Sequence, residues 1–171
     1  MATYVDDIII VANDPIKYLN KLKNIFPIRN IELASAYYLG NGIEMKENGT
    51  MKISSKKYTN ETITRYESKY GMLKKQNIPA IIDDHPKMDD TPLLNEDGIR
   101  HFQSNIGICQ WISTAGRFDI TYVVSSLRRF AHQLREGHLE RSEKILGYLK
   151  KYSKRGYIVD PRDPIVDIEY E

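Results

Sequence analysis

Cysteine is nearly absent from this chain of 171 residues, which contains only Cys109. One cysteine excludes an internal disulfide and suits a reducing compartment. No apolar run approaches the length of a membrane-spanning helix, and the first residues do not resemble a secretory signal. The glycosylation patterns at Asn48 and Asn60 therefore carry no weight. The composition predicts an intracellular chain that does not enter a membrane.

Several common catalytic arrangements are also missing. The ten glycines form no phosphate-cradling loop, and the sequence offers no Ser-His-Asp or Cys-His arrangement. His132 and His138 are six residues apart, which places them on different faces of a helix, so they form no metal-ligand pair. Cys109 lies on an apolar stripe, which favours a core position over a nucleophile. With a net charge of only +2, any surface for nucleic acid must be local.

The composition is that of a globular protein, with 41% apolar and 28% charged residues. A chain of this length forms one domain or part of a larger one, with a core of its own. Only Met1 to Tyr4 precede the first recognisable turn, enough for a stub of a strand. We therefore expect the chain to begin within a domain.

The first turn carries two adjacent carboxylates, Asp6 and Asp7, in front of four β-branched apolar residues at 8–11. Such a run favours a strand buried on both faces. Acids beside a buried strand need a partner that replaces their hydration, and a divalent cation is such a partner. Two-metal phosphoryl transfer also expects a third carboxylate, for which this chain has no obvious candidate. The alternative is that the two acids only cap a turn.

The first half predicts a helix and then a hairpin with a second helix. A helix begins at Asp14-Pro15 and ends before Pro27. A hairpin follows, with one arm at 36–45 interrupted by glycines, an Asn48-Gly49 turn and a returning arm at 51–54. Ser54 or Ser55 then caps a helix that runs to about residue 70. In the first helix, the residues predicted to face inward are Ile16, Leu19, Leu22 and Phe26. In the second helix, they are Tyr58, Ile63, Tyr66 and Tyr70.

The second half is predicted to be a connector followed by helices. Residues 71–98 contain three prolines, and 83–97 hold six acids against one base, which indicates a connecting segment on the surface. Apolar spacing predicts a helix over 99–112 and another capped by Asp119 that runs to Leu134. A third helix follows Gly137, and residues 156–159 form a possible strand.

Residues 128–155 contain nine basic and three acidic residues, a net charge of +6. Interleaved tyrosines and basic helices suit a phosphate backbone. The alternative is a solvated helix face with ordinary Glu–Lys pairing. The nine bases are Arg128, Arg129, Arg135, Arg141, Lys144, Lys150, Lys151, Lys154 and Arg155.

These features resemble the C-terminal part of the reverse transcriptase of copia-type LTR retrotransposons. Tyr4-Val5-Asp6-Asp7 resembles the catalytic turn of reverse transcriptases, and Tyr37-Tyr38-Leu39-Gly40 resembles a Tyr-Phe-Leu-Gly strand of that family. The order and spacing of further motifs span almost the whole chain. They are Lys57-Tyr58, Thr91-Pro92, His101-Phe102-Gln103-Ser104-Asn105-Ile106-Gly107, Gly116-Arg117-Phe118-Asp119-Ile120, Ser126-Leu127-Arg128-Arg129-Phe130, Gly137-His138-Leu139 and Gly147-Tyr148-Leu149-Lys150. Phe118 stands where the family has Pro, and Arg128 where it has Ser.

The resemblance implies an α+β fold, a partial polymerase palm followed by a helical thumb. Residues 1–75 would be the C-terminal part of the palm and 76–98 an acidic connector. Residues 99–155 would be the thumb-like region, and 156–171 the start of a linker toward a ribonuclease H domain. The fingers, the first hairpin arm and an earlier palm strand with a further metal-binding Asp would lie outside this chain.

The resemblance also implies the roles of individual residues. Asp6 and Asp7 would bind Mg²⁺ or Mn²⁺ and act in catalysis, with Tyr4 and Val5 near the primer end and the incoming nucleotide. Leu39 and Gly40 would belong to the primer grip. The thumb residues facing the backbone of the template–primer would be Arg128, Arg129, Lys150 and Lys151.

The implied activity is RNA-directed DNA synthesis by two-metal phosphoryl transfer within a longer polyprotein, with the chain alone inactive. Its partners would be an RNA or DNA template–primer, deoxynucleoside triphosphates and the rest of the polyprotein, including the integrase, fingers and ribonuclease H. The setting would be a virus-like particle in the cytoplasm. The alternative is a catalytically dead, nucleic-acid-binding remnant of a decayed copia-type element.

Overall fold

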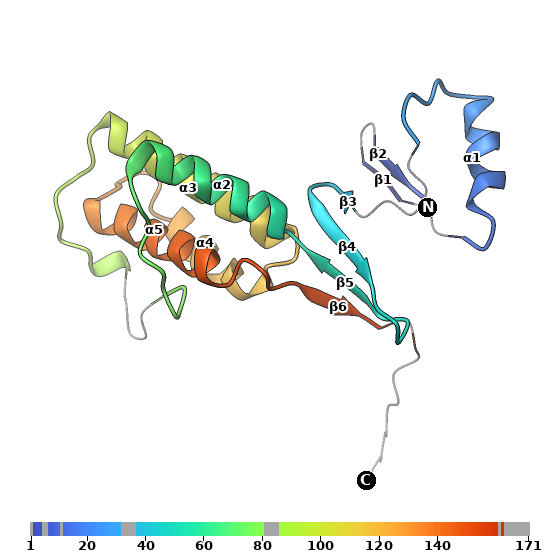
Figure 1. Cartoon of the computed structure of the whole chain (residues 1–171). Coiled ribbons are helices and arrows are strands. Elements are labelled where there is room, and N and C mark those ends of the chain that lie inside the picture. Colours follow the sequence, from blue (N-terminus) through green and yellow to red (C-terminus); the bar gives the residue numbers. More distant parts are fainter. Residues whose placement is uncertain are drawn as a thin grey trace, which may run out of the picture.

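The structure is a computed structural model that describes residues 2–4, 7–10, 12–31, 37–80, 86–160 and 162. Figure 1 shows a small N-terminal hairpin with a helix, a four-stranded sheet and a body of helices. The first elements are β1 (Ala2–Tyr4), β2 (Asp7–Ile9), α1 (Pro15–Lys23), β3 (Tyr37–Tyr38), β4 (Asn41–Met45), β5 (Met51–Ser54) and α2 (Lys56–Tyr70). The later elements are the 3-10 helix η1 (Pro86–Met88), α3 (Glu96–Thr114), the 3-10 helix η2 (Phe118–Ile120), α4 (Thr121–Arg128), α5 (Glu136–Lys151) and β6 (Tyr157–Val159).

The N-terminal strands β1 and β2 form an antiparallel hairpin, with Tyr4 opposite Asp7. The prediction of a short strand stub before the acids is confirmed, because β1 has three residues. Val5, Asp6 and Val11 lie outside the described residues. The prediction of a strand buried on both faces is wrong for Ile8, which is 43% exposed. The described part of this hairpin pairs with no third strand that would cover it.

Helix α1 begins where the sequence predicts. The Asp14 carboxylate accepts a hydrogen bond of 3.1 Å from the Lys17 amide, and proline occupies the first turn. The helix ends at Lys23, ahead of Pro27. Its apolar stripe is not buried, however, since Ile16 is 51% exposed and no residue of α1 is buried. The prediction of an inward-facing stripe therefore fails within this chain.

The second sheet has the order β3-β4-β5-β6 and is antiparallel throughout. The prediction of a single arm over 36–45 is wrong, because Leu39 and Gly40 form a two-residue turn that pairs β3 with β4. Both residues have positive φ, 50° and 75°, which matches the twist of a tight hairpin. The Asn48-Gly49 turn is confirmed, with the Gly49 amide donating to the Lys46 carbonyl at 2.9 Å.

The predicted C-terminal strand is confirmed as β6, and the structure shows its partner. It pairs with β5 so that Ile158 lies opposite Lys52. The end of the helical region thus returns to the sheet that precedes it (Figure 1).

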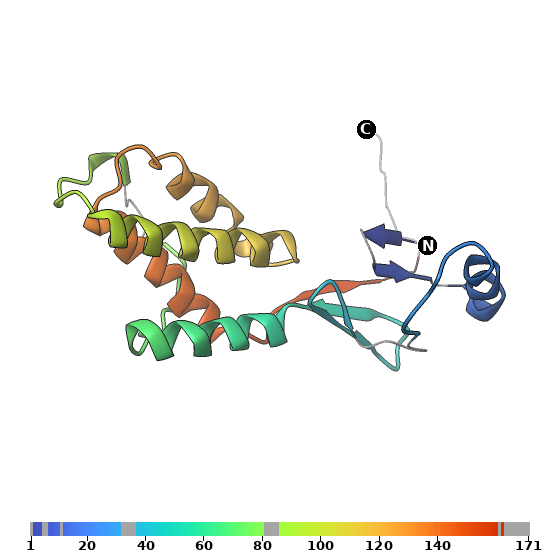
Figure 2. The same cartoon turned by 90° about the horizontal axis from the view of Figure 1, so that it is seen from above.

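The helical body packs around α3 and α5, as seen in the two views of Figures 1 and 2. Ile63 and Tyr66 of α2 are buried as predicted, whereas Tyr70 is 41% exposed and that prediction is wrong. Cys109 is fully buried, and burial raises the pKa of its thiol to about 12, so it is an inert core residue. The core consists of Ile63, Tyr66, Leu73, Phe102, Ile106, Cys109, Ile112, Ile120, Val124, Leu127, Leu134, Ile145, Leu146, Tyr148 and Leu149.

The helix predicted from Asp119 to Leu134 is shorter than expected. Asp119 lies inside η2 rather than at a helix N-cap, and α4 ends at Arg128. The Asp119 carboxylate is held by the side chains of Arg117 and Tyr148, so it does not cap the following amides. Leu134 is still buried, at 4% exposure, although it lies outside the helix.

The predicted connector is not simply a surface segment. Leu73 is buried in the core, and the Gln76 amide donates to the Gly147 carbonyl at 3.2 Å. The Leu94 amide donates to the Leu134 carbonyl at 2.9 Å. Both described stretches, 71–80 and 86–95, therefore contact the helical body, while 81–85 lie outside the described residues. None of the described helices is long and apolar enough to cross a membrane.

Candidate nucleic-acid interface

The predicted acidic turn falls between β1 and β2 in the sequence. Tyr4 is the last residue of β1, Asp7 is the first of β2, and these two residues are paired across the hairpin. Val5 and Asp6 lie between these two residues in the sequence and outside the described residues.

The chemistry of this donor pair fits a divalent cation. Mg²⁺ prefers hard oxygen ligands and commonly takes one or two protein carboxylates, with the remaining positions left to water or phosphate. In the part of the chain that the structure describes, no cluster of three His, Cys, Asp or Glu could hold a metal. The sequence supplies two adjacent carboxylates here, and two-metal phosphoryl transfer would need a further acid from another segment.

The turn predicted to be part of the primer grip is the connection between β3 and β4. Leu39 is the one described non-glycine residue with positive φ. Gly40 has open space around its Cα, so this turn could be approached closely by another molecule. The Tyr37 ring beside it lies under the Lys57 ammonium at 5.2 Å. Gly40 is exposed and Leu39 is half-buried, and the backbone shape of this turn is set by the hairpin rather than by the core.

The basic segment at 128–155 divides into residues that stabilise the fold and residues that face outward. Lys150 belongs to the first group, since its ammonium bonds Glu67 at 2.6 Å and the Leu73 carbonyl at 3.1 Å. These contacts lower the pKa of Glu67, with the hydrogen bond from Lys150 the largest cause. The contact predicted for Lys150 with a template–primer backbone thus competes with an internal ion pair.

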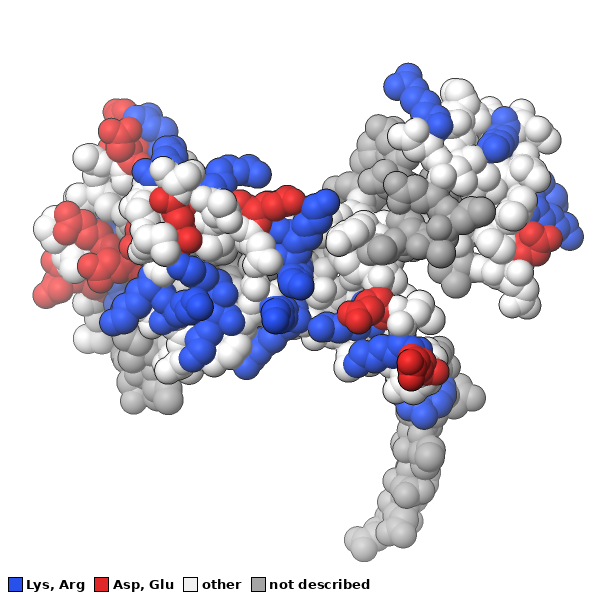
Figure 3. All heavy atoms as spheres, viewed as in Figure 1, with Lys and Arg blue, Asp and Glu red and all other residues white. Residues whose placement is uncertain are grey.

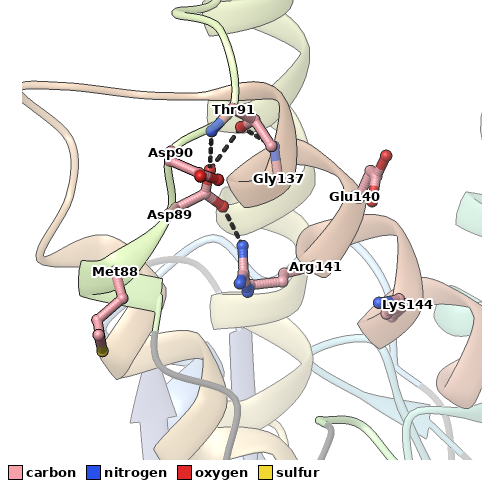
Figure 4. A pocket seen from close by; sticks show the side chains of 8 residues that line it. All are labelled: Met88, Asp89, Asp90, Thr91, Gly137, Glu140, Arg141 and Lys144. Carbon is pink, nitrogen blue, oxygen red and sulfur yellow. Dashed lines mark hydrogen bonds and ion pairs between the residues drawn. The ribbon is translucent and has the colours of Figure 1, made fainter.

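Arg135 and Arg141 also bond within the fold, where they join α5 to the segment before α3. Arg135 donates to the Thr91 carbonyl, and Arg141 pairs with Asp89, whose side chain is 2% exposed. Figure 4 shows this shallow polar pocket, with Asp89 between Thr91 and Arg141. Burial alone would raise the pKa of Asp89, but hydrogen bonds from Thr91 and Arg141 outweigh it and hold the pKa below its ordinary value. The pocket is therefore occupied by its own ion pair.

A second internal ion pair lies where η2 meets α5. Arg117 is 2% exposed and binds Asp119 with two hydrogen bonds of 2.9 and 2.8 Å, while its third nitrogen donates to the Tyr152 carbonyl at 3.0 Å. The Tyr148 hydroxyl donates to Asp119 at 2.6 Å. Burial would raise the pKa of Asp119, yet the hydrogen bonds from Arg117 and Tyr148 lower it below its ordinary value. The motif at 116–120 therefore has a structural role in this fold.

The outward-facing bases include Arg128, Arg129 and Lys151 among the predicted contacts. Arg128 donates to the Gln110 side chain of α3 at 2.9 Å, which places it beside the outer face of that helix. Arg129 is exposed at the end of α4, and Lys151 bonds the exposed side chain of Asn77. These cations remain accessible to a ligand, unlike Lys150.

The outer face of α3 forms a strip that sequence patterning did not single out. We call it the α3 strip; its exposed residues are Gln103, Gly107, Trp111 and Thr114, spaced four, four and three apart. Trp111 is 38% exposed, with an edge contact to Tyr58, and a side chain at Gly107 would meet nothing within 4 Å. Acidic residues are absent from 98–114 and from 120–135. Neither stretch therefore contains an acid that would repel a phosphate backbone at this strip or at Arg128.

A histidine was also overlooked in the sequence, because its partners come from distant helices. The His101 ring stacks on Tyr70 at 3.6 Å, and its Nε2 lies 3.1 Å from the Tyr66 hydroxyl, which donates to Glu143 at 2.8 Å. Burial lowers the pKa of His101 and raises that of Tyr66, to which the bond with Glu143 adds. These contacts among Tyr70, His101, Tyr66 and Glu143 connect α2, α3 and α5. The stacking on His101 explains the conformation of the partly exposed Tyr70.

Two retrotransposon proteins are similar to this chain. It is 29% identical over 152 residues to the putative transposon Ty5-1 protein YCL074W of Saccharomyces cerevisiae, covering 87% of this chain and 48% of that protein. It is also 29% identical over 153 residues to the retrovirus-related Pol polyprotein from transposon RE1 of Arabidopsis thaliana, covering 87% of this chain and 10% of that polyprotein. No family model and no solved structure matches.

The similarity extends over most of this chain, so it is not the effect of one short motif. The chain spans about half the length of the yeast relative (48%) and a tenth of the plant polyprotein (10%). These matches support a retrotransposon origin and a context within such a polyprotein.

Proposed function

We propose that this chain is the part of a copia-type reverse transcriptase that carries the catalytic turn and the thumb, and that it acts in RNA-directed DNA synthesis within a longer polypeptide. The observation that carries the proposal is the pairing of Tyr4 with Asp7 across an antiparallel hairpin, with Val5 and Asp6 between them in the sequence. The retrotransposon relatives support it over 87% of the chain. Neighbouring carboxylates at a hairpin end suit a nucleotidyl transfer site.

In this proposal, Asp6 and Asp7 bind Mg²⁺ or Mn²⁺, and Tyr4 and Val5 lie beside the primer end and the incoming nucleotide. When bound, the cation supplies charge stabilisation to the attacking and leaving oxygens of phosphoryl transfer. The third carboxylate comes from another segment of the polypeptide. The Leu39-Gly40 turn, in which Gly40 is exposed, positions the primer strand.

The α3 strip, with Arg128 at its side, is the surface that we assign to the template–primer duplex. The open space at Gly107 lets the edge of a groove of the duplex approach the backbone of α3. Trp111 supplies an exposed apolar surface beside it. Arg128 and Arg129 then neutralise phosphates on the strand beside α4. In this assignment, the surface that contacts the duplex is an uncharged strip with arginines at its side, and not a uniformly basic face of the thumb.

Primer extension tests the polymerase proposal. The isolated chain should not extend oligo(dT) on poly(rA) with Mg²⁺, because it supplies only two adjacent acids. Joined to the segment that precedes the matched region in the RE1 polyprotein, it should extend the primer. The same RE1 segment with its own matched region is the control for the assay.

Either of two outcomes would contradict this proposal. Clear extension by the isolated chain would show that no further carboxylate is needed. A folded joined protein that fails to extend, while its RE1 control succeeds, would show that this chain cannot take the place of a polymerase region.

A second candidate function is nucleic-acid binding without catalysis, favoured by the acid-free α3 strip and the exposed arginines beside it. Gly107→Glu should weaken duplex binding at least tenfold, because it adds a negative charge where nothing lies within 4 Å. The fold should not suffer, since replacing a helix-interior glycine favours the helix by about 0.5–1 kcal/mol. Fluorescence anisotropy with a labelled RNA–DNA duplex measures the effect.

Thr64→Glu is the matched control, because it adds the same charge to an exposed position of α2. It should change duplex affinity by less than twofold. Equal losses for Gly107→Glu and Thr64→Glu would mean that the α3 strip has no special role and that only net charge matters.

A further inference from the structure

A second basic surface lies on α5, and the structure assembles it from two distant parts of the sequence. Its members are exposed or half-exposed lysines from the segment after α2 and from α5 and its C-terminal end. We call it the α5 basic face; its residues are Lys74, Lys75, Lys144, Lys151 and Lys154. Figure 3 shows Lys and Arg gathered over the region where α5 and the segment after α2 lie.

The two parts are held together by close backbone packing. The Gln76 amide donates to the Gly147 carbonyl at 3.2 Å, and Lys151 bonds the Asn77 side chain. A Cβ at residue 147 would lie 2.2 Å from the Lys74 carbonyl oxygen, so only glycine lets the segment lie this close to α5. Lys74 and Lys75 are thereby fixed beside the lysines of α5.

The charges of this face are not neutralised within the described part of the chain. None of its five lysines forms an ion pair there, in contrast to Lys150, which pairs with Glu67, and Arg141, which pairs with Asp89. Glu140 is the acid of α5 that lies one turn before Lys144, and it forms no ion pair with that lysine among the described residues. The neighbouring Glu143 accepts from Tyr66 on another side of the helix. The face therefore keeps a clear positive excess.

The α5 basic face is separate from the α3 strip. Helix α3 packs on α5 through its buried residues, among them Phe102, Ile106 and Cys109, and the α3 strip lies on the outer side of α3. The segment at 74–77 covers α5 at Gly147, on a side of α5 that α3 does not occupy. The helical body thus has two surfaces suited to phosphates, and one duplex lying on the α3 strip leaves the other free.

We infer that the α5 basic face binds a phosphodiester strand through its backbone, independently of sequence, as a second nucleic-acid contact apart from the α3 strip. Lysines are mobile point charges suited to phosphates rather than to base edges. Lys144 and Lys151 are seven residues apart, a rise of about 10 Å along α5, enough to reach successive phosphates. The nearby Tyr152 ring is covered by the Arg155 guanidinium at 3.9 Å, so it offers little free surface for a base. The inference does not depend on polymerase activity.

Fluorescence anisotropy with a labelled 20-nucleotide RNA of mixed sequence tests the inference on the full chain. The triple variant Lys74→Gln, Lys75→Gln and Lys151→Gln should lose at least tenfold in affinity. Losing three phosphate contacts should also reduce the slope of log K against log salt by about 2, since each contact on a single strand contributes about 0.7. A mixed-sequence duplex in a parallel arm distinguishes a single strand from a duplex as the source of the phosphates, and a loss in either arm supports the inference.

The matched control is Lys17→Gln, Lys21→Gln and Lys23→Gln, which removes the same charge from exposed positions of α1. It should change affinity by less than twofold. Because Lys151 contacts Asn77, the double variant Lys144→Gln and Lys154→Gln provides a second test, with a smaller expected loss of about fivefold. Circular dichroism confirms the fold of each variant.

Three results would overturn the inference. Equal losses in the two triple variants would mean a response to net charge alone. Absence of RNA binding at low salt would mean that the face does not bind a phosphodiester strand. Displacement of RNA by a polyglutamate peptide at lower concentration than by unlabelled RNA would assign the face to an acidic protein partner.

Discussion

Replacing Arg117 with methionine is expected to lower the free energy of unfolding by about 3 kcal/mol. Methionine keeps an unbranched side chain but removes the charge, leaving Asp119 and the Tyr152 carbonyl without their main donor. Breaking a buried ion pair by removing one partner costs roughly 3–5 kcal/mol, and the lower end applies here because Asp119 is 33% exposed. Urea unfolding at pH 7, followed by circular dichroism, measures the loss.

Arg100→Met is the matched control, because Arg100 pairs with Glu96 and Asp97 on the exposed side of α3. An exposed pair contributes about 0–1 kcal/mol, so the control should lose less than 1 kcal/mol. If the two variants lose the same amount, the buried position of Arg117 does not stabilise the fold. A loss for Arg117→Met below 1 kcal/mol would have the same meaning.

The pH dependence of the same pair supplies a second readout. The folded pKa of Asp119 is lowered, so the unfolded chain binds protons first as the pH falls. The stabilisation of the fold by the ionised Asp119 carboxylate is fully present above the unfolded pKa, near 3.9. This stabilisation is lost as the pH falls through the pKa of Asp119 in the folded state. In Arg117→Met the folded and unfolded pKa values lie closer together, and stability should fall less steeply with acid. An unchanged slope below pH 4 would contradict the assigned ion pair.

Asp6→Asn in the joined protein is expected to reduce primer extension at least 10³-fold. Removing one carboxylate from the proposed site takes away several kcal/mol of metal-dependent charge stabilisation, and each 1.36 kcal/mol corresponds to a factor of ten in rate. The affinity for the template–primer should stay within twofold, because the proposed duplex contacts lie on α3, on α4 and at the Leu39-Gly40 turn rather than at Asp6. Single-turnover extension and anisotropy on the same preparation separate the two effects.

Asp14→Asn is the matched control, since Asp14 is an exposed acid of the same N-terminal region. Its role is to cap α1, and asparagine caps a helix about as well as aspartate. Asp14→Asn should extend primers at the rate of the parent. If Asp6→Asn and Asp14→Asn behave alike, Asp6 is an ordinary turn residue and the proposed site is wrong.

Local features of the fold were predictable from the sequence because short-range chemistry decides them. Asp14 with Pro15 determined where α1 begins, and Asn48 with Gly49 determined the second hairpin turn. The buried position of Cys109 followed from its place on an apolar stripe. Asp119 was misread because an N-cap and an ion-pair partner look identical in sequence, and the difference depends on the distant Tyr148.

The candidate sites show the same division. Adjacent acids at a turn before an isoleucine-rich run are visible in the sequence, and they indicated the hairpin end that β1 and β2 form. The excess of basic residues at 128–155 was also visible, but its division into internal and outward-facing cations was not. That division depends on Glu67 and Asp89, which lie more than fifty residues away from the bases that they bind.

By itself, the sequence determined the start of α1, the Asn48-Gly49 turn, the carboxylate pair and the local excess of positive charge, because each depends on residues a few positions apart. Only the tertiary structure decided that β6 completes the sheet, that Lys150 and Arg141 act inside the fold, and that Lys74 joins the lysines of α5. These arrangements depend on packing between segments that are distant in the chain, which spacing along the sequence does not encode.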